Sequence, residues 1–296
     1  MPALTPVPTR SSPHAPIVRM TPPLPLAPSA APAAGPPEGA VLGRLGRLVA
    51  RLAQGPRDVA RAQALRHAVF VEEGGASRVG REAGLESDAL DGVCDHLLVE
   101  EAGTATVIGT YRLLTDTVAR REGRFYSDAE FEVSELVARN PERRFLELGR
   151  SCVAPGWRGR RTIELLWQGV WAYALAHGSD AMIGCVSLPG TDPAPHAGTL
   201  GLLGGAALAP PAWQARARRG SERVPLPDGP EHAPDRAALG GLPPLLKGYL
   251  RLGGRVGPDA VIDRDFNCID VFVALPREAI ARRYLRHYGV DADRLV

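Results

Sequence analysis

The stretch that decides the fold reads Arg144-Phe-Leu-Glu147-Leu-Gly-Arg150-Ser-Cys-Val153 and continues through Pro155-Gly-Trp-Arg158-Gly-Arg-Arg161-Thr162 into a long amphipathic run. This pattern predicts a strand, a basic turn and a helix. A helix N-terminus favours anions through its free N–H groups and its dipole. The segment therefore places a carboxylate, an arginine and an anion-binding turn close together, which suits the transfer of a group carried on a phosphorylated arm.

Composition excludes some classes of protein. The chain has 296 residues, of which 45% are hydrophobic and 23% charged, and its formal net charge is +2. This near balance excludes a dedicated nucleic-acid binder, which is usually strongly basic. Six arginines and only two glutamates lie between Glu142 and Arg161, however, and local charge of this kind can steer an acidic partner.

The cysteines predict no metal site and no disulfide framework. Cys94, Cys152, Cys185 and Cys268 form no Cys-x-x-Cys or Cys/His cluster. Most of them lie in apolar, strand-like runs, where a buried free thiol in a reducing compartment is the ordinary interpretation. No run of about 18 apolar residues indicates a membrane span.

The chain divides into a tail and one domain. Residues 1–40 hold 12 of the 28 prolines, and such a segment cannot bury enough surface to order itself. Residues 41–296 are expected to form a single domain. Within it, residues 193–240 are rich in Pro, Ala, Gly and Arg and predict a loop-rich excursion with a short helix.

Periodicity predicts a mixed α/β fold. Helices are expected over residues 56–70, 162–178, 244–251 and 277–288, and a capping-box pattern at Ser127–Glu130 predicts another helix start. Strands are expected over residues 96–100, 107–114, 145–153, 181–186 and 269–275, the first two as an antiparallel hairpin. Residues 41–53 suit either an arginine-lined amphipathic helix or a strand from Leu48, and the glycines there favour the strand. We therefore expect a central mixed sheet with helices on its faces.

Several motifs resemble those of a known family. In this order along the chain, they resemble the GNAT-type N-acyltransferase fold and, more specifically, the L-ornithine N-acyltransferases of bacterial ornithine-lipid synthesis. The motifs are Ala64-Leu-Arg66-His-Ala-Val-Phe70, Asp91-Gly-Val-Cys-Asp95-His-Leu-Leu-Val99, Gly109-Thr-Tyr-Arg112, Phe145-Leu-Glu147-Leu-Gly-Arg150-Ser-Cys-Val153, Glu164-Leu-Leu-Trp-Gln-Gly-Val-Trp171, Ser187-Leu-Pro-Gly-Thr-Asp-Pro193 and Leu242-Pro-Pro-Leu-Leu-Lys-Gly-Tyr-Leu-Arg251.

The resemblance implies an activity and its partners. It implies an N-acyltransferase that moves a 3-hydroxylated fatty acyl group from acyl carrier protein to the α-amine of L-ornithine and so forms lyso-ornithine lipid. The phosphopantetheine thioester of the carrier is then a co-substrate, and no metal or redox cofactor is implied. The expected location is cytoplasmic, with attachment to the inner membrane surface left open.

A more distant resemblance, to acyl-homoserine-lactone synthases, implies substrate-binding residues. Their pattern falls on four places along the chain: Arg66 and Phe70, Asp91 and Asp95, Arg112, and Glu147 and Arg150. The aspartates are four residues apart here instead of three, and the tryptophan expected after the Phe is missing. Asp91 and Asp95 suit the binding of a cationic side chain, with solvated aspartates as the alternative. Arg112 and Arg150 suit either the positioning of Glu147 and the two aspartates or a bidentate clamp on the carboxylate of the amino acid, with support of the fold as the alternative.

Glu147 and Arg150 are the expected catalytic residues. The attacking amine must be neutral, and a carboxylate beside it can take its proton or hold the ammonium before proton loss. Glu147 lies on the strand before the basic turn and suits this role. The alternative is a structural ion pair of Glu147 with Arg150 or Arg112.

The turn formed by Arg158, Gly159, Arg160, Arg161 and Thr162 is the expected phosphopantetheine and carrier site. It departs from the glycine-rich pyrophosphate loop of the fold, since Arg161 and Ile163 stand where small residues are expected. It therefore suits the single phosphodiester of acyl carrier protein better than coenzyme A, with arginines that dock the acidic carrier. A solvated basic turn is the alternative.

Two rival functions stay open on sequence alone. One is acyl transfer to another amine, as in lactone-signal synthesis. The other is a non-catalytic protein that docks on membranes or carriers through its arginines.

Overall fold

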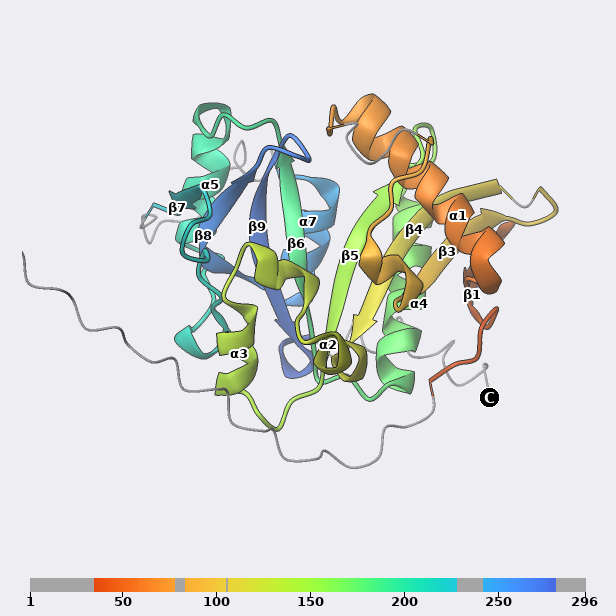
Figure 1. Ribbon diagram of the computed structural model, residues 1–296, viewed down its shortest axis with the longest axis horizontal. Coiled ribbons are helices and arrows are strands. Elements are labelled where there is room, and N and C mark those ends of the chain that lie inside the picture. The colour runs from red at the N-terminus through yellow and green to blue at the C-terminus, as the bar shows by residue number, and fades with distance from the viewer. Residues whose placement is uncertain (1–34, 78–82, 105, 228–241, 281–296) are drawn as a thin grey trace, which may run out of the picture.

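One nine-stranded sheet runs through the computed structural model, which describes residues 35–77, 83–104, 106–227 and 242–280 (Figure 1). The strand order is β1-β2-β3-β4-β5-β6-β9-β8-β7. Neighbouring strands are antiparallel except β5 and β6, which are parallel. The strands are β1 Val41–Leu45, β2 Leu48–Leu52, β3 Asp95–Glu101, β4 Thr106–Thr115, β5 Phe145–Val153, β6 Ala181–Pro189, β7 Arg223–Pro225, β8 Arg255–Asp263 and β9 Cys268–Pro276.

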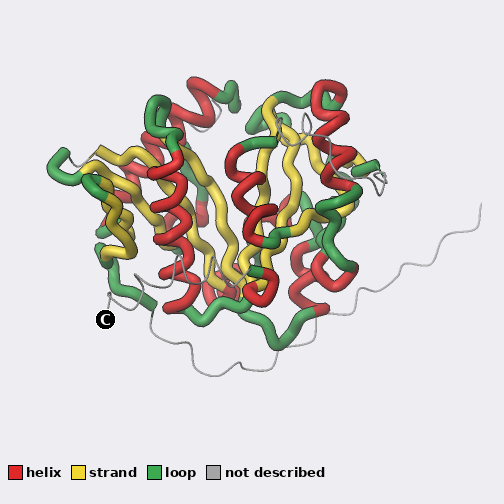
Figure 2. The backbone as a smooth tube through the Cα atoms, turned by 180° about the vertical axis from the view of Figure 1, so that it is seen from behind, coloured by secondary structure: helices red, strands yellow, loops and turns green. Residues whose placement is uncertain are grey.

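Helices cover both faces of the sheet. Helices α1, α2 and α3 lie on the face toward the viewer in Figure 1, and α4 and α7 cross the opposite face, as the view from behind shows (Figure 2). The α-helices are α1 Gly55–Arg66, α2 Asp116–Glu122, α3 Val133–Arg139, α4 Arg160–Ala176, α5 Ala197–Gly204 and α7 Pro244–Leu252. The shorter helical segments are a π-helix η1 His67–Glu73 and the 3-10 turns η2 Ala89–Gly92, η3 Tyr126–Ala129, η4 Ala194–His196, η5 Pro211–Trp213 and η6 Arg277–Ala279.

The core lies on both sides of the sheet. All nine residues of β9 are buried, because helices or loops cover both of its faces. On the α4 and α7 side, the rings of Trp167 and Tyr249 meet edge to face with centroids 4.8 Å apart and join the two helices. On the other side, Phe125, Phe131 and Phe272 belong to a second apolar cluster.

The expected architecture is confirmed. A mixed sheet with helices on its faces forms, β3 and β4 pair as an antiparallel hairpin, and β5 covers residues 145–153 as predicted. Residues 41–53 form two strands instead of a helix, and Gly46 makes the tight turn between them with a φ of 63°. This outcome agrees with the expected strand from Leu48 and adds the strand β1 before it.

Four predictions of local structure are corrected. Ser127 does not cap a helix, because its hydroxyl donates to Glu147; the chain makes a 3-10 turn there and α3 begins at Val133. Helix α4 is capped by Gly159, and Thr162 lies buried in its first turn. Strand β8 was not expected. Of the last expected helix, Arg277–Ala279 form a 3-10 turn that ends at an extended Ile280, and residues 281–288 lie outside the described residues.

The segment at residues 193–240 holds α5 and the short strand β7, in keeping with an excursion from the main sheet, and residues 228–241 lie outside the described part. Most of the proposed tail, residues 1–34, also lies outside the described part. At the end of the tail, the Ala40 carbonyl accepts a hydrogen bond from the Leu52 N–H, which joins the chain to the sheet. Within the described residues, no helix is long and apolar enough to cross a membrane.

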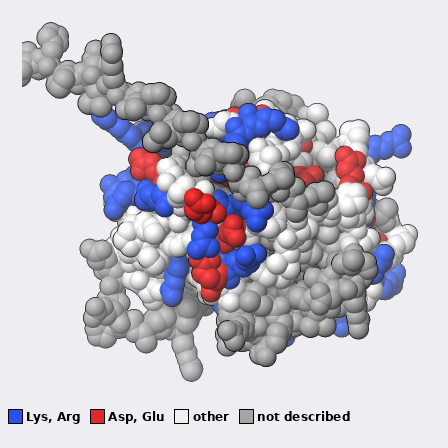
Figure 3. All heavy atoms as spheres, turned by 90° about the horizontal axis from the view of Figure 1, so that it is seen from below, with Lys and Arg blue, Asp and Glu red and all other residues white. Residues whose placement is uncertain are grey.

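Basic and acidic side chains lie side by side on the lower face of the molecule (Figure 3). Ion pairs join segments at the ends of strands, such as Arg143 with Glu278 at 2.7 Å and Arg144 with Asp180 at 3.8 Å. The Arg143–Glu278 pair is exposed and therefore contributes little to stability.

Candidate active site

A cavity of 510 Å³ opens where β5 and β6 separate. The two parallel strands are paired only from Phe145 with Ala181 to Glu147 with Ile183. Just beyond this pairing, β6 passes close to β5 at Gly184. Only glycine fits there, because a Cβ would collide with the Leu148 carbonyl oxygen. Beyond this point residues of both strands line the cavity, together with residues of η1, α4, α7 and the β8–β9 turn.

Strand β5 carries a bulge at the cavity wall. Arg112 pairs with Gly149 and Thr110 with Cys152, so two residues of β5 stand opposite the single Tyr111 of β4. Arg150 adopts a left-handed backbone with a φ of 51°, which is uncommon outside glycine. Such strain persists only where surrounding contacts fix it, and it concentrates at functional sites.

Glu147 lies at the inner end of the cavity and is 2% exposed. Its carboxylate accepts hydrogen bonds from the Tyr126 N–H at 2.6 Å, the Ser127 N–H at 2.8 Å and the Ser127 hydroxyl at 2.5 Å. Burial raises the pKa of Glu147, and the bonds from Ser127 and Tyr126 oppose that rise. The expected alternative, an ion pair with Arg112 or Arg150, does not form, so Glu147 is a cavity carboxylate without a cationic partner among the described residues.

A buried network of three arginines and three acids supports the bulge. Arg66 pairs with Glu86 at 2.7 Å and with Asp91. Arg112 bridges Asp88 at 2.6 Å and Asp91 at 3.0 Å. Since positive and negative groups alternate and match in number, each buried charge has a partner.

Arg150 completes this network and also faces the cavity. Its guanidinium contacts Glu86 and Asp88, each at 3.1 Å, and lies over the rings of Tyr126 and Phe266 at 4.4 and 4.5 Å from their centroids. It lines the cavity, whereas Arg66 and Arg112 do not. Arg150 is therefore the residue that suits the predicted carboxylate clamp. Arg66 and Arg112 belong to the ion-pair network that supports Arg150.

The structure separates the predicted aspartate pair. Asp91 is 5% exposed, and the charge and hydrogen bonds of Arg66 lower its pKa although burial opposes this. Asp95 is exposed and accepts a hydrogen bond from the Tyr173 hydroxyl of α4 at 2.6 Å. Neither lines the cavity, so the idea that they bind a cationic side chain there is not supported. Phe70 does line it, where it meets Phe266 edge to face at 6.0 Å.

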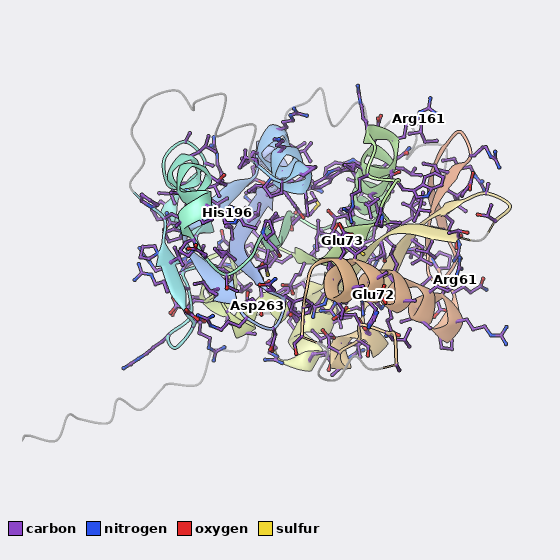
Figure 4. All side chains as sticks on the ribbon, turned by 90° about the horizontal axis from the view of Figure 1, so that it is seen from above. Arg61, Glu72, Glu73, Arg161, His196 and Asp263 are labelled. Carbon is purple, nitrogen blue, oxygen red and sulfur yellow. The ribbon has the colours of Figure 1, made fainter. Side chains whose placement is uncertain are left out.

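The basic turn lies at the cavity mouth, at the start of α4. Arg158 lines the cavity and binds Glu73 through two bonds of 2.6 and 2.5 Å. The side chain of Arg160 is 91% exposed, and Arg161 is also exposed. Figure 4 looks down on this end of the molecule and shows Arg161 at the start of α4 and Glu73 at the end of η1. Gly159 is the N-cap of α4, and Thr162 lies buried in the first turn of that helix.

Sequence reasoning missed an acidic group on the far wall. Asp263 and Asp270 line the cavity, and Asp270 is 8% exposed. Burial, and repulsion from Asp270 and Asp263, raise the pKa of the adjacent Glu130 to about 9. One signal could have found this group: Asp270 interrupts the apolar run of β9, and a charged residue is rarely buried inside a strand without a partner.

Cys185 and Ser127 were also missed. The Cys185 thiol lines the cavity and donates to the Ser127 hydroxyl at 3.3 Å, so a chain of polar groups leads to Glu147. Burial raises the pKa of Cys185 well above its usual value, which keeps it a neutral thiol. Ligand atoms of Glu130, Cys185 and Asp270, and of Asp263, Cys268 and Asp270, lie within 4.8 Å of one another, near enough to contact one cation.

Comparison with known proteins gives consistent matches. A family model described as an acetyltransferase (GNAT) domain matches residues 65–168. The chain is 48% identical to the L-ornithine N(alpha)-acyltransferase of Rhizobium meliloti (strain 1021), over 87% of this chain and 90% of that protein. It is 47% identical to the enzyme of the same name from Agrobacterium fabrum, over 86% of this chain and 89% of that protein.

Solved structures resemble the chain at lower identity. An N-acyl amino acid synthase from uncultured soil microbes is 12% identical, covers 78% of this chain and 91% of its own, and superposes with a TM-score of 0.47.

Proposed function

The chain belongs to the L-ornithine N(alpha)-acyltransferase family, and we propose that it transfers a 3-hydroxyacyl group from acyl carrier protein to the α-amine of L-ornithine. Relatives over most of its length carry that name, and a GNAT domain model matches, so the chain is an acyltransferase and not a non-catalytic docking protein. The observation that carries the proposal is the position of Glu147 in a cavity between diverging parallel strands.

In the proposed reaction, the acyl thioester enters between β5 and β6 from the mouth at Arg158. The neutral α-amine attacks the thioester carbonyl carbon; the new C–N bond forms, the C–S bond breaks, and the thiolate leaves and takes up the proton that Glu147 has removed from the amine. Glu147 receives the proton that the amine loses. Its raised pKa makes it a better proton acceptor than an exposed carboxylate would be. No redox change occurs, so the reaction needs no redox cofactor.

Arg150 is the group we assign to the carboxylate of the amino acid. Among the residues that the structure describes, two basic side chains line the cavity, Arg150 and, at its mouth, Arg158. An arginine can hold a carboxylate through two parallel hydrogen bonds, which fixes its orientation. This would point the α-amine of the acceptor toward Glu147.

Acyl carrier protein is the proposed donor, because the turn before α4 is built from arginines. Arg160 and Arg161 are exposed at a helix start, where both the charge and the free N–H groups favour anions. Such a surface complements an acidic carrier with a single phosphodiester. Because the acyl product has a long apolar chain, we also propose that the protein works in the cytoplasm at the surface of the inner membrane.

The proposal is tested by mixing the purified protein with 3-hydroxyacyl carrier protein and L-ornithine, and in parallel with the matching acyl-coenzyme A. We expect loss of the carrier thioester and formation of Nα-acylornithine, with slower turnover of the coenzyme A thioester. Equal or faster turnover of acyl-coenzyme A would refute the carrier as donor. Absence of acylornithine with both donors would refute the function.

A further inference from the structure

We propose that Asp263 and Asp270, which line the cavity, bind the side-chain ammonium of the amino-acid acceptor. This inference rests on the proposed function and adds to it a specificity site that distinguishes a diamino acid from other amino acids. The site lies on the wall of the cavity formed by β9 and the β8–β9 turn, and Figure 4 shows Asp263 at this end of the molecule.

The geometry brings these acids together from distant parts of the chain. Glu130 follows the turn η3, Asp263 ends β8, and Asp270 lies in the third position of β9. An oxygen of Glu130 and an oxygen of Asp263 each lie within 4.8 Å of an Asp270 oxygen. A primary ammonium has three N–H donors and can bind several carboxylates at once.

The charges distinguish this group from those buried acids of the described chain that pair with an arginine. Asp58, Glu86 and Asp91 each pair with an arginine. Glu130, Asp263 and Asp270 form no ion pair with a basic residue in the part of the chain that the structure describes. A buried carboxylate without a cation is costly, and neighbouring carboxylates add repulsion to that cost. The group therefore favours an incoming positive charge.

Access to the cavity is an independent observation. Asp270 is more than nine-tenths buried within the protein and yet lines the same cavity as Glu147. Asp263 lines it too, and the N–H groups of Asp265 and Phe266 donate to the Asp263 carboxylate and fix its position. Asp270 also accepts a hydrogen bond from the Cys268 thiol at 3.4 Å, but neither Asp263 nor Asp270 has a cationic partner among the described residues, and both border the cavity proposed for the acceptor.

The chemistry of ornithine matches the cavity. Its α-amine reacts, its carboxylate needs a cation, and its second amine is charged at neutral pH. The cavity offers Glu147, Arg150 and the acids at Asp263 and Asp270 for these three groups. This arrangement also explains which amine would be acylated, because the second amine is held as an ammonium ion and cannot attack.

The test compares L-ornithine with L-norvaline, which has the same carbon chain without the second amine. The purified enzyme is assayed with 3-hydroxyacyl carrier protein, and kcat/KM is measured for both acceptors. In Asp270→Asn and Asp263→Asn, we expect the preference for ornithine to fall about 10- to 100-fold, since hydrogen bonds to charged groups are strong. The kcat/KM for norvaline should stay within about threefold, because norvaline makes no such bonds.

The matched control is Asp265→Asn, which removes the same charge from an exposed residue of the same turn. This variant should keep the preference of the wild type. A preference that is unchanged in both Asp270→Asn and Asp263→Asn would overturn the inference while leaving the proposed function intact. No acylation of ornithine by the wild type would instead refute the proposed function itself.

Two further readouts complete the test. Activity on norvaline shows that a variant is folded, and Asp263, which is less buried than Asp270, still tests the site if Asp270→Asn unfolds. Wild-type activity is also measured after treatment with EDTA and after addition of Mg²⁺ or Zn²⁺. Loss of activity after EDTA and its recovery after addition of the metal ion would mean that the acids hold a metal. This result would overturn the inference.

Discussion

The hydroxyl of Ser127 donates a 2.5 Å hydrogen bond to Oε1 of Glu147. The N–H groups of Ser127 and Tyr126 bind the same carboxylate, so the turn η3 fixes the position and the charge of the group that we assign as the base. The bonds from Ser127 favour the ionised carboxylate and thereby oppose the rise in pKa that burial causes.

Glu147→Gln should lower kcat by about 100- to 10,000-fold, because an amide of the same shape cannot accept the proton of the amine. The measurement is steady-state acylation of ornithine at saturating donor. The control is Glu142→Gln, which changes an exposed glutamate five residues earlier and should leave kcat unchanged. A Glu147→Gln enzyme with wild-type turnover would remove Glu147 from its proposed role.

Ser127→Ala should move the acidic limb of the pH profile of kcat/KM upward by about one unit, since a lost hydrogen bond to a charged group costs about 1.5–3 kcal/mol, of which one pKa unit is 1.36 kcal/mol. The direction follows from the contribution of Ser127, which lowers the pKa of Glu147. A profile that does not move, or moves to lower pH, would contradict this link. If the variant keeps its activity at pH values above the acidic limb, the shift cannot be due to unfolding.

Arg66→Met should destabilise the protein by about 3–5 kcal/mol, because it leaves Glu86 and Asp91 buried without their cation. Urea unfolding measures this change. The control is Arg57→Met on the same helix, where the arginine is exposed and the expected change is within about 0.5 kcal/mol. Equal midpoints for the two variants would show that the network does not support the fold.

The acids on the far wall should make stability fall as pH rises. The folded pKa of Glu130, about 9, lies above its usual value of 4.5, so the folded state holds a proton that the unfolded state releases. This contribution is complete below about pH 4.5 and is lost as pH approaches about 9. Asp270→Asn removes one of the repelling carboxylates and should flatten the decline. An unchanged slope in thermal unfolding between these limits would count against the coupling.

Arg161→Ala should raise the KM for acyl carrier protein about tenfold, since it removes one charge–charge contact at the carrier interface, while kcat stays the same. Higher salt should shrink the difference between the two enzymes, because salt screens exposed charges. Arg47→Ala, on the exposed β1–β2 turn, is the control. If both variants keep the wild-type KM, the carrier docks elsewhere.

Much of the fold could be predicted from periodicity and turn residues. The run at residues 145–153 leads into a basic turn, and it forms β5 as expected. Strand β8 was missed because it contains Gly257, Pro258 and Asp259, which normally end strands. A register shift between Val256 and Ala260 accommodates these residues, and the local sequence does not predict that shift.

The site could be predicted only in part. Glu147 and Arg150 share one strand with the turn beside them, and the structure places both at the cavity. Ser127 was misread because its hydroxyl binds a residue twenty positions away instead of its own helix. Glu130, Asp263 and Asp270 meet only after the sheet has formed, so their spacing in the sequence carries no sign of their contact.

The most direct test of the central claim is mass spectrometry of the lipids of a bacterial host that lacks ornithine lipids and expresses this chain. With the wild type we expect lyso-ornithine lipid, which is ornithine with a 3-hydroxyacyl group on its α-amine. With Glu147→Gln at the same protein level we expect this lipid to be lost. Wild-type cells without acylornithine, or Glu147→Gln cells with as much of it as the wild type, would contradict the account.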